Sequence, residues 1–196
     1  MSSRFDQGIP EGVLERARAG DRAAQGELFA LFGPAVFGLA RRMLGRADQA
    51  DDVLQETFVE VLRGLPQFRG EAPLGMWIRR IAVNECLMHM RSHWHRFRLP
   101  LDSGAEGSSV EEWLAADDPP PDKGLDMERA LDALAPEARA VVWLHDVEGY
   151  THVEIARLMK ATPSFSKSQL ARAYVRMRQW AGEAKEVQAC MPALNN

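Results

Sequence analysis

The chain has 196 residues, a net charge of −4, 46% hydrophobic and 27% charged residues, which is the composition of a globular protein with one or two domains. Its two cysteines, Cys86 and Cys190, stand far apart without a CxxC motif, so we expect neither a disulfide framework nor a cysteine zinc site. Met1 to Gly12 is polar, and no apolar run approaches the roughly 20 residues that span a bilayer. The expected protein is soluble and cytoplasmic.

Charge is segregated along the chain. Residues 99–124 hold seven acids and one lysine, a net charge of −6, so the remainder sums to +2. Residues 79–98 hold five arginines and three histidines against Glu85 alone. This distribution indicates basic binding faces on either side of an acidic connector.

The first part of the chain, residues 12–98, predicts a helical domain. A helix begins near Gly12 and resumes after Asp21, a candidate N-cap, and Gly33-Pro34 should kink or restart it before Gly45 ends it. A second helix starts near Asp48. Residues 65–74 are rich in glycine and proline and predict a loop, and a long helix follows over 75–94.

Residues 99–124 predict a flexible acidic linker, with one helical turn around 110–116. A second helical domain, residues 125–184, should contain helices over 125–134 and from Pro136 to Gly149. The tail is polar, and we expect it to be loose beyond Cys190. No alternation with a period of two persists, so the predicted fold class is all-α.

The stretch from Thr151 to Trp180 predicts two helices joined by a tight turn. Thr151 and Glu154 form a capping box, and Thr162-Pro163 is a second helix start. The second helix is basic and has no carboxylate before Trp180. This is a helix-turn-helix pattern, in which the second helix enters the major groove, although a helical hairpin with a solvated basic face would show the same spacing.

Five stretches in register resemble bacterial sigma factors of group IV, the extracytoplasmic-function (ECF) type, over roughly residues 20–180. They are DQADDVLQETF from Asp48, FRGE from Phe68, WIRRIA from Trp77 with Asn84, LAPE from Leu134 with Arg139, and EGYTHVEIA from Glu148 continuing into SKSQL from Ser166. The resemblance implies an initiation subunit that recruits RNA polymerase to stress-type promoters and carries no catalysis or cofactor of its own.

The resemblance implies that an acidic face binds core RNA polymerase at the clamp helices of its large subunit. The matching positions are Asp48, Asp51, Asp52, Gln55, Glu56 and Phe58. A helical period places Asp52 and Glu56 on one face, which suits a basic partner helix. The alternative is that the acids only stabilise a helix N-terminus and that Phe58 is a core residue.

The resemblance also implies a −10 element read as a melted single strand. The matching residues are Phe68, Arg69, Gly70, Glu71, Arg79, Arg80, Asn84 and Arg91. A flipped base needs a pocket and polar contacts, and the arginines can neutralise phosphates, so binding should depend on salt. Trp77 spaces with Ile81 and is expected to pack in the core rather than to stack on bases.

The −35 element would be read by the helix after the turn. The matching residues are Ser164, Phe165, Lys167, Ser168, Ala171, Arg172 and Arg176, of which Arg176, like Arg178, is expected to hold the DNA backbone. Lys160 stands where the family commonly has glycine, and Ser164-Phe165 where Gly-Thr is typical. These departures put the preferred −35 sequence in doubt.

Three other readings remain. His89 and His93 are four residues apart, but His95 points off that face, so a basic DNA-facing helix end accounts for the histidines better than a metal does. A stand-alone helix-turn-helix regulator would need a dimerisation or ligand domain, and a hydrolase using His145 and Asp146 lacks a nucleophile motif. From the family we expect control by an anti-sigma factor, often membrane-anchored.

Overall fold

The computed structural model describes residues 5–97 and 126–190, and the side chains of all of these except 92–97, 126–128 and 181–190. Within these ranges every regular element is a helix, in agreement with the predicted all-α class. The expected linker over 99–124, with its helical turn, lies outside the described residues, as does the tail beyond Cys190.

Four α-helices and one 3-10 turn make up the N-terminal domain. Their bounds are α1 Val13–Arg18, α2 Arg22–Leu44, α3 Ala47–Gly64, η1 Leu65–Gln67 and α4 Leu74–Phe97. The Asp21 carboxylate accepts a hydrogen bond from the Ala23 amide at 2.9 Å, so this residue is the expected N-cap of α2. The region predicted as a loop after α3 begins with the short η1 helix.

Helix α2 is continuous through Pro34, so the predicted restart does not occur. Pro34 and Ala30, whose carbonyl the proline leaves without an amide partner, both lie on the exposed side of the helix. Water can satisfy that carbonyl there, which is why the helix tolerates the proline. The helix ends at Gly45, whose φ of 83° is the left-handed conformation that favours glycine after a helix.

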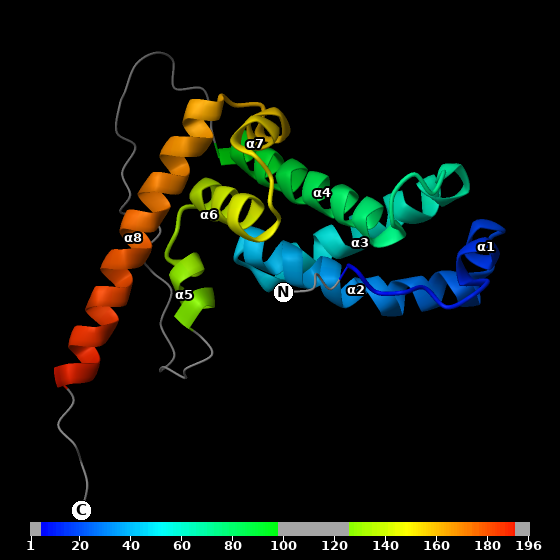
Figure 1. Ribbon diagram of the computed structural model, residues 1–196, viewed down its shortest axis with the longest axis horizontal. Coiled ribbons are helices and arrows are strands. Elements are labelled where there is room, and N and C mark those ends of the chain that lie inside the picture. Colours follow the sequence, from blue (N-terminus) through cyan, green and yellow to red (C-terminus); the bar gives the residue numbers. More distant parts are fainter. Residues whose placement is uncertain (1–4, 98–125, 191–196) are drawn as a thin grey trace, which may run out of the picture.

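The core of the domain forms where α2 packs against α1, α3 and α4 (Figure 1). Leu28, Phe32, Val36 and Met43 of α2 are fully buried in it. By length and composition α2 is the one described helix that could cross a membrane, which the sequence reading had not anticipated. One face of α2 packs into the core and Phe29 on another face is 45% exposed, so a buried core face accounts for much of its hydropathy.

The C-terminal domain comprises α5 Asp126–Asp132, α6 Pro136–Val142, α7 His152–Met159 and α8 Pro163–Cys190. The helix expected from Pro136 to Gly149 changes character halfway, because residues Trp143–Val147 form a π-helix, η3. The Glu148 amide donates to the Trp143 carbonyl at 3.0 Å, a bond that closes over five residues rather than four. Gly149, with φ of 74°, then ends the segment as predicted.

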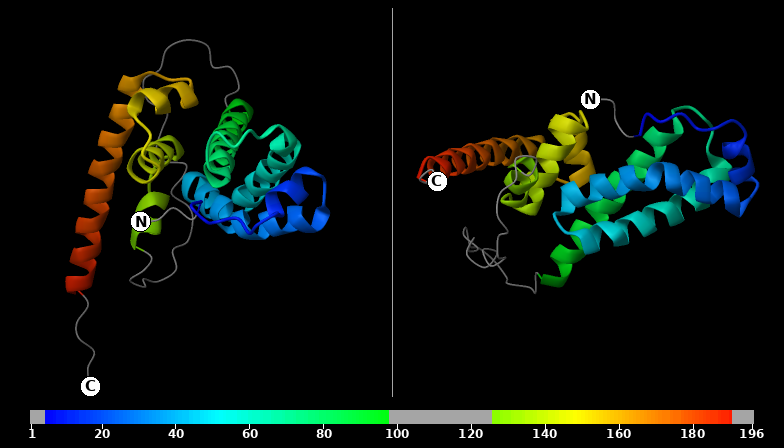
Figure 2. Two further views of the ribbon diagram at one scale, coloured as in Figure 1. Left: turned by 45° about the vertical axis from the view of Figure 1, so that its right-hand side comes forward. Right: turned by 90° about the horizontal axis from the view of Figure 1, so that it is seen from below.

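The two domains pack against each other. Helix α6 lies along the C-terminal end of α2, and the buried apolar residues of both domains form one continuous cluster (Figures 1 and 2). The sequence predicted two domains joined by a linker, and it did not predict that they would share a core.

Candidate nucleic-acid interface

Helices α7 and α8 form the predicted helix-turn-helix. The capping box is present: the Glu154 amide donates to Thr151 Oγ1 at 3.3 Å, and the Thr151 amide donates to the Glu154 carboxylate at 2.8 Å. The hydrogen bonds from the Thr151 backbone and side chain lower the pKa of Glu154. Lys160 ends α7 with φ of 53°, the only described non-glycine residue with positive φ, which accounts for glycine being the usual residue there.

Thr151→Ala should destabilise α7 by about 1 kcal/mol, because alanine cannot accept the Glu154 amide bond. Hydrogen exchange of the α7 amides, followed by mass spectrometry, measures this local opening. Thr151→Ser keeps the hydroxyl and is the control. Equal exchange in the alanine and serine variants would show that the cap does not stabilise the helix.

Helix α8 presents a basic face to solvent. The Thr162 hydroxyl accepts a hydrogen bond from the Phe165 amide at 3.1 Å and so caps the helix start. Ser166, Leu170 and Ala173 point into the domain. The predicted −35 residues lie outward: Ser164, Lys167, Ala171, Arg172 and Arg176 are exposed, and Phe165 and Ser168 are half-buried. Residues expected to face DNA are therefore available on one helix.

A chain of side chains from η3 to α8 joins the elements behind that face. His145 Nδ1 donates a hydrogen bond to the Asp146 carboxylate at 2.8 Å, and the His145 ring stacks on His152 with ring centroids 4.5 Å apart. His152 Nδ1 lies 3.0 Å from the Ser166 hydroxyl. This array contains the residue types of a hydrolase, but Ser166 is fully buried and no substrate can reach it. The array positions α8 against the rest of the domain.

The predicted polymerase-binding residues lie at the start of α3. Asp51, Asp52, Gln55 and Glu56 are exposed. Asp48 pairs with Arg46 at 2.8 Å, and this hydrogen bond lowers the pKa of Asp48. Glu85 of α4 lies near them, and burial, together with the charges of Glu56 and Glu60, raises its pKa. The surface formed by these groups is strongly negative.

Phe58 is not part of that surface. Its side chain is 5% exposed and packs on Phe29 of α2, with ring centroids 4.7 Å apart. The ring is therefore in the core in this structure, which is the alternative that the sequence leaves open for Phe58, and its contact with the polymerase stays a prediction. Phe29 itself is 45% exposed.

The predicted −10 residues are divided between two environments. Arg69, Gly70 and Glu71 form an exposed loop, with an Arg69–Glu71 ion pair at 3.7 Å. On α4, Arg80, Asn84 and Arg91 fall within about 40° of one another at 100° per residue and so share one face. Arg80 is exposed, and Asn84 and Arg91 are half-buried. Arg91 also donates to the Leu87 carbonyl at 3.1 Å.

Two residues of the −10 set are not accessible. Phe68 is 8% exposed and packs on Trp77, with ring centroids 5.1 Å apart, and Trp77 is half-buried against the core, as its spacing predicts. Arg79 lies about a quarter turn from Arg80 on α4 and is 9% exposed. Its guanidinium pairs with the Glu148 carboxylate of the C-terminal domain. Phe68 and Arg79 are therefore not open to DNA in this arrangement, and their −10 contacts stay a prediction.

No group of three or more metal-ligating residues lies together among the residues with described side chains. His89 is half-buried and has an interaction partner, and the side chains of His93 and His95 lie outside the described set.

The chain is similar to known proteins over both domains. The family description Sigma-70 region 2 matches residues 28–96, and Sigma-70, region 4 matches residues 125–177. The RNA polymerase sigma factor CarQ of Myxococcus xanthus is 30% identical over 170 residues, covering 87% of this chain and 96% of CarQ. The ECF RNA polymerase sigma factor SigM of Mycobacterium tuberculosis is 32% identical over 168 residues, covering 84% and 80%.

Among solved structures, the sigma factor RpoE of Bartonella quintana, in complex with the anti-sigma factor NepR, has a similar fold, with a TM-score of 0.51, 20% identity and coverage of 80% of this chain and 96% of that one. The helices, the two matched regions and these relatives define a promoter-recognition subunit of bacterial transcription. The chain belongs to the sigma-70 family and is an alternative sigma factor of the ECF type.

Sequence reasoning missed two residues of this arrangement. Glu148 was read only as part of a family motif, yet it is the partner that buries Arg79. Arg139 was read in the same way, yet it is 7% exposed and donates to three backbone carbonyls. An arginine among the apolar residues Ala138, Ala140 and Val141 is the signal that could have identified it, because buried arginines need several acceptors.

Proposed function

We propose that the chain binds core RNA polymerase through the exposed acids of α3 and positions it on promoters by two DNA contacts. The N-terminal domain, residues 12–98, would act as region 2 and bind the melted −10 strand, and residues 125–184 would act as region 4 and bind the −35 duplex. The observation that carries the proposal is the pairing, within one chain, of a negative α3 surface with a basic face on α8 that has no carboxylate over residues 163–180. The first suits a basic protein partner and the second suits DNA.

The −10 contact would use the exposed loop Arg69–Glu71 together with the face of α4 that carries Arg80, Asn84 and Arg91. The amide of Asn84 can both donate to and accept from a base edge, and the arginines can bind phosphates. The acidic linker, residues 99–124, would follow the path of RNA toward the polymerase active site, since its net charge of −6 resembles that of a nucleic acid.

The protein would act in the cytoplasm, without catalysis of its own, and its activity would be controlled by an anti-sigma factor. The solved RpoE–NepR complex supports such control, because that fold neighbour is bound to an anti-sigma factor. A membrane-anchored anti-sigma factor would couple this chain to an external signal.

The experiment that tests the function is run-off transcription with core polymerase on a genomic fragment library, with direct measurement of core binding. The proposal expects core binding and discrete transcripts that depend on the added chain. A chain that fails to bind core but shifts duplex DNA alone would be a stand-alone helix-turn-helix regulator instead.

Arg172→Ala should weaken binding of the holoenzyme to −35 duplex DNA by about 1–3 kcal/mol, roughly 5- to 150-fold, and leave core binding unchanged. Arg172 is exposed on α8, and alanine is a good helix former, so the helix should persist. Fluorescence anisotropy with a promoter isolated by the run-off screen measures the loss. Arg22→Ala, which removes an exposed arginine of α2, is the charge-matched control. Loss of both DNA and core binding would assign Arg172 a structural role.

A further inference from the structure

The contact between the two domains is built around Arg79 and Glu148. The two side chains are 11% and 10% exposed and form an ion pair, and Arg79 also donates to the Glu148 backbone carbonyl. The guanidinium carbon lies 5.6 Å from the centroid of the Tyr150 ring, a cation–π distance. Glu148 in turn accepts a hydrogen bond from Trp143 Nε1 at 3.0 Å. Arg79 is thus enclosed by partners from the C-terminal domain.

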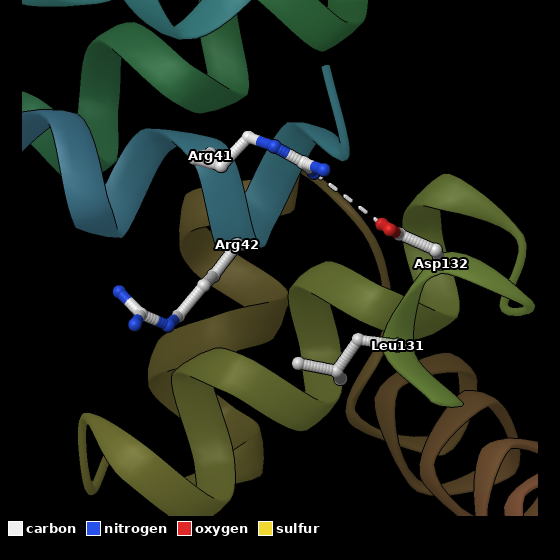
Figure 3. Close-up of a pocket in the computed structure, with 4 residues that line it drawn as sticks. All are labelled: Arg41, Arg42, Leu131 and Asp132. Carbon is white, nitrogen blue, oxygen red and sulfur yellow. Dashed lines mark hydrogen bonds and ion pairs between the residues drawn. The ribbon is translucent and has the colours of Figure 1, made fainter. Parts of the chain in front are cut away.

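A second group of contacts lies at the C-terminal end of α2. Arg41 pairs with Asp132 of α5 at 3.4 Å, beside a small pocket that Arg42 and Leu131 also line (Figure 3). Arg42 lies 5.3 Å from the centroid of the Trp143 ring. The end of α2 is therefore held by side chains of α5 and η3.

At the same place Gly45 receives the guanidinium of Arg139. A β-carbon on Gly45 would lie 1.4 Å from Arg139 Nη1, so the close approach depends on glycine. Together with the shared apolar cluster, these contacts form a well-packed interface between the two domains.

The buried pair makes this contact sensitive to its charges. Burial raises the pKa of Glu148, while the nearby Arg79 charge opposes that rise. A complete buried ion pair contributes little net stability, because the attraction between the two charges is offset by the cost of removing both from water. Removing one partner leaves an uncompensated buried charge, which is strongly unfavourable. Loss of the Glu148 charge should therefore favour separation of the domains, which returns Arg79 to solvent.

We infer that the free chain closes on itself, and that docking of the C-terminal domain through Glu148 masks Arg79 and the adjacent part of α4 from nucleic acid. The closure itself needs only the contacts above. Its inhibitory consequence rests on the proposed function and on the phosphate contact that the family resemblance predicts for Arg79, because one guanidinium cannot bind Glu148 and a phosphate in the same position. Opening the chain would then precede promoter binding.

The test of closure is a distance measurement on the full chain by pulsed electron paramagnetic resonance. Spin labels are placed at Val59→Cys on α3 and Val175→Cys on α8, whose native side chains are 52% and 51% exposed, in a Cys190→Ser background. Cys86 is fully buried, and burial raises the pKa of its thiol, so it should not be labelled.

Glu148→Gln, which preserves shape, should shift the distance distribution to longer and broader values. Glu137→Gln removes an equal charge from α6 and should match the unsubstituted chain. The exchange Arg79→Glu with Glu148→Arg should restore the short distance. Identical distributions for the unsubstituted chain and Glu148→Gln would overturn the closure, as would a broad distribution in the unsubstituted chain.

Masking is tested by anisotropy of a labelled single-stranded 20-nucleotide DNA of random sequence, since phosphate contacts do not depend on sequence. Glu148→Gln should bind this DNA several-fold more tightly than Glu137→Gln does. Both variants lose one negative charge, so the difference between them reports the unmasking of Arg79. Longer distances without this gain would retain the closure and overturn the masking of Arg79. Failure of core binding or transcription would count against the proposed function alone, since neither readout here contains polymerase.

Discussion

Replacing Asp52 and Glu56 together by lysine is expected to abolish core-polymerase binding and, with it, all transcription that depends on this chain. The two carboxylates are exposed, lie four residues apart on α3 and share a face. Against a basic partner helix, each reversal replaces an attraction by a repulsion, and like-charge contacts at an interface cost several kcal/mol. We expect at least a roughly 100-fold loss of affinity.

The same substitutions should leave the fold intact. Both positions are exposed and lie beyond the first turn of α3, where the positive end of the helix dipole has little effect, so lysine should cost little stability there. Core binding is measured by fluorescence anisotropy of labelled chain, and the helical circular dichroism of the variant is compared with that of the original. The matched control reverses Glu11 and Glu15, which are also exposed and four residues apart but lie at α1. Undiminished core binding in the α3 variant would move the polymerase surface elsewhere.

Local signals in the sequence predicted the helices well, because each end depends on residues next to it. Asp21, Gly45, Thr151 and Gly149 act at the positions expected from their caps and backbone angles. The candidate site residues came from the family resemblance, and helical spacing placed Asp52 and Glu56 on one face of α3. Pro34 is an instructive exception, since its cost depends on whether it faces solvent, and that is decided by tertiary packing.

The sequence could not predict the exposure of side chains that are buried by segments far away in the chain. The sequence around Phe58 and Phe68 would be the same whether these rings faced a partner or the core. Their burial is decided by contacts with Phe29 and Trp77, which the local sequence does not show. Arg79 is a basic residue in a basic stretch, and its burial depends on Glu148, 69 residues later in the chain. A resemblance between motifs matches sequence positions and carries no information on which of them the chain covers in its own closed state.

The second large effect concerns Arg139, whose substitution by methionine should destabilise the C-terminal domain by about 2–4 kcal/mol. The buried guanidinium donates to the carbonyls of Leu131 at 2.7 Å, Asp132 at 2.9 Å and Leu134 at 3.3 Å. These carbonyls lie at the end of α5 and in the turn into α6. The Leu131 carbonyl also accepts from the Leu134 amide at 3.0 Å, so the loss falls mainly on the Asp132 and Leu134 carbonyls. Methionine fills much of the volume but donates no hydrogen bond, and each buried acceptor left unpaired costs about 1–3 kcal/mol.

A domain of this size is stabilised by only a few kcal/mol, at about 0.05–0.15 kcal/mol per residue, so this loss should unfold a substantial fraction of it near physiological temperature. Hydrogen exchange in the full chain, with increasing urea, reports the opening of α6, α7 and the start of α8 separately from that of the N-terminal domain. Arg157→Met, at an exposed position of α7, is the control for loss of a charged side chain. If both variants open at the same urea concentration, the carbonyl network does not hold the domain. If the C-terminal domain of Arg139→Met alone opens at lower urea, while exchange in α2 and α3 stays unchanged, the hydrogen bonds of Arg139 stabilise the domain that carries the −35-binding helix.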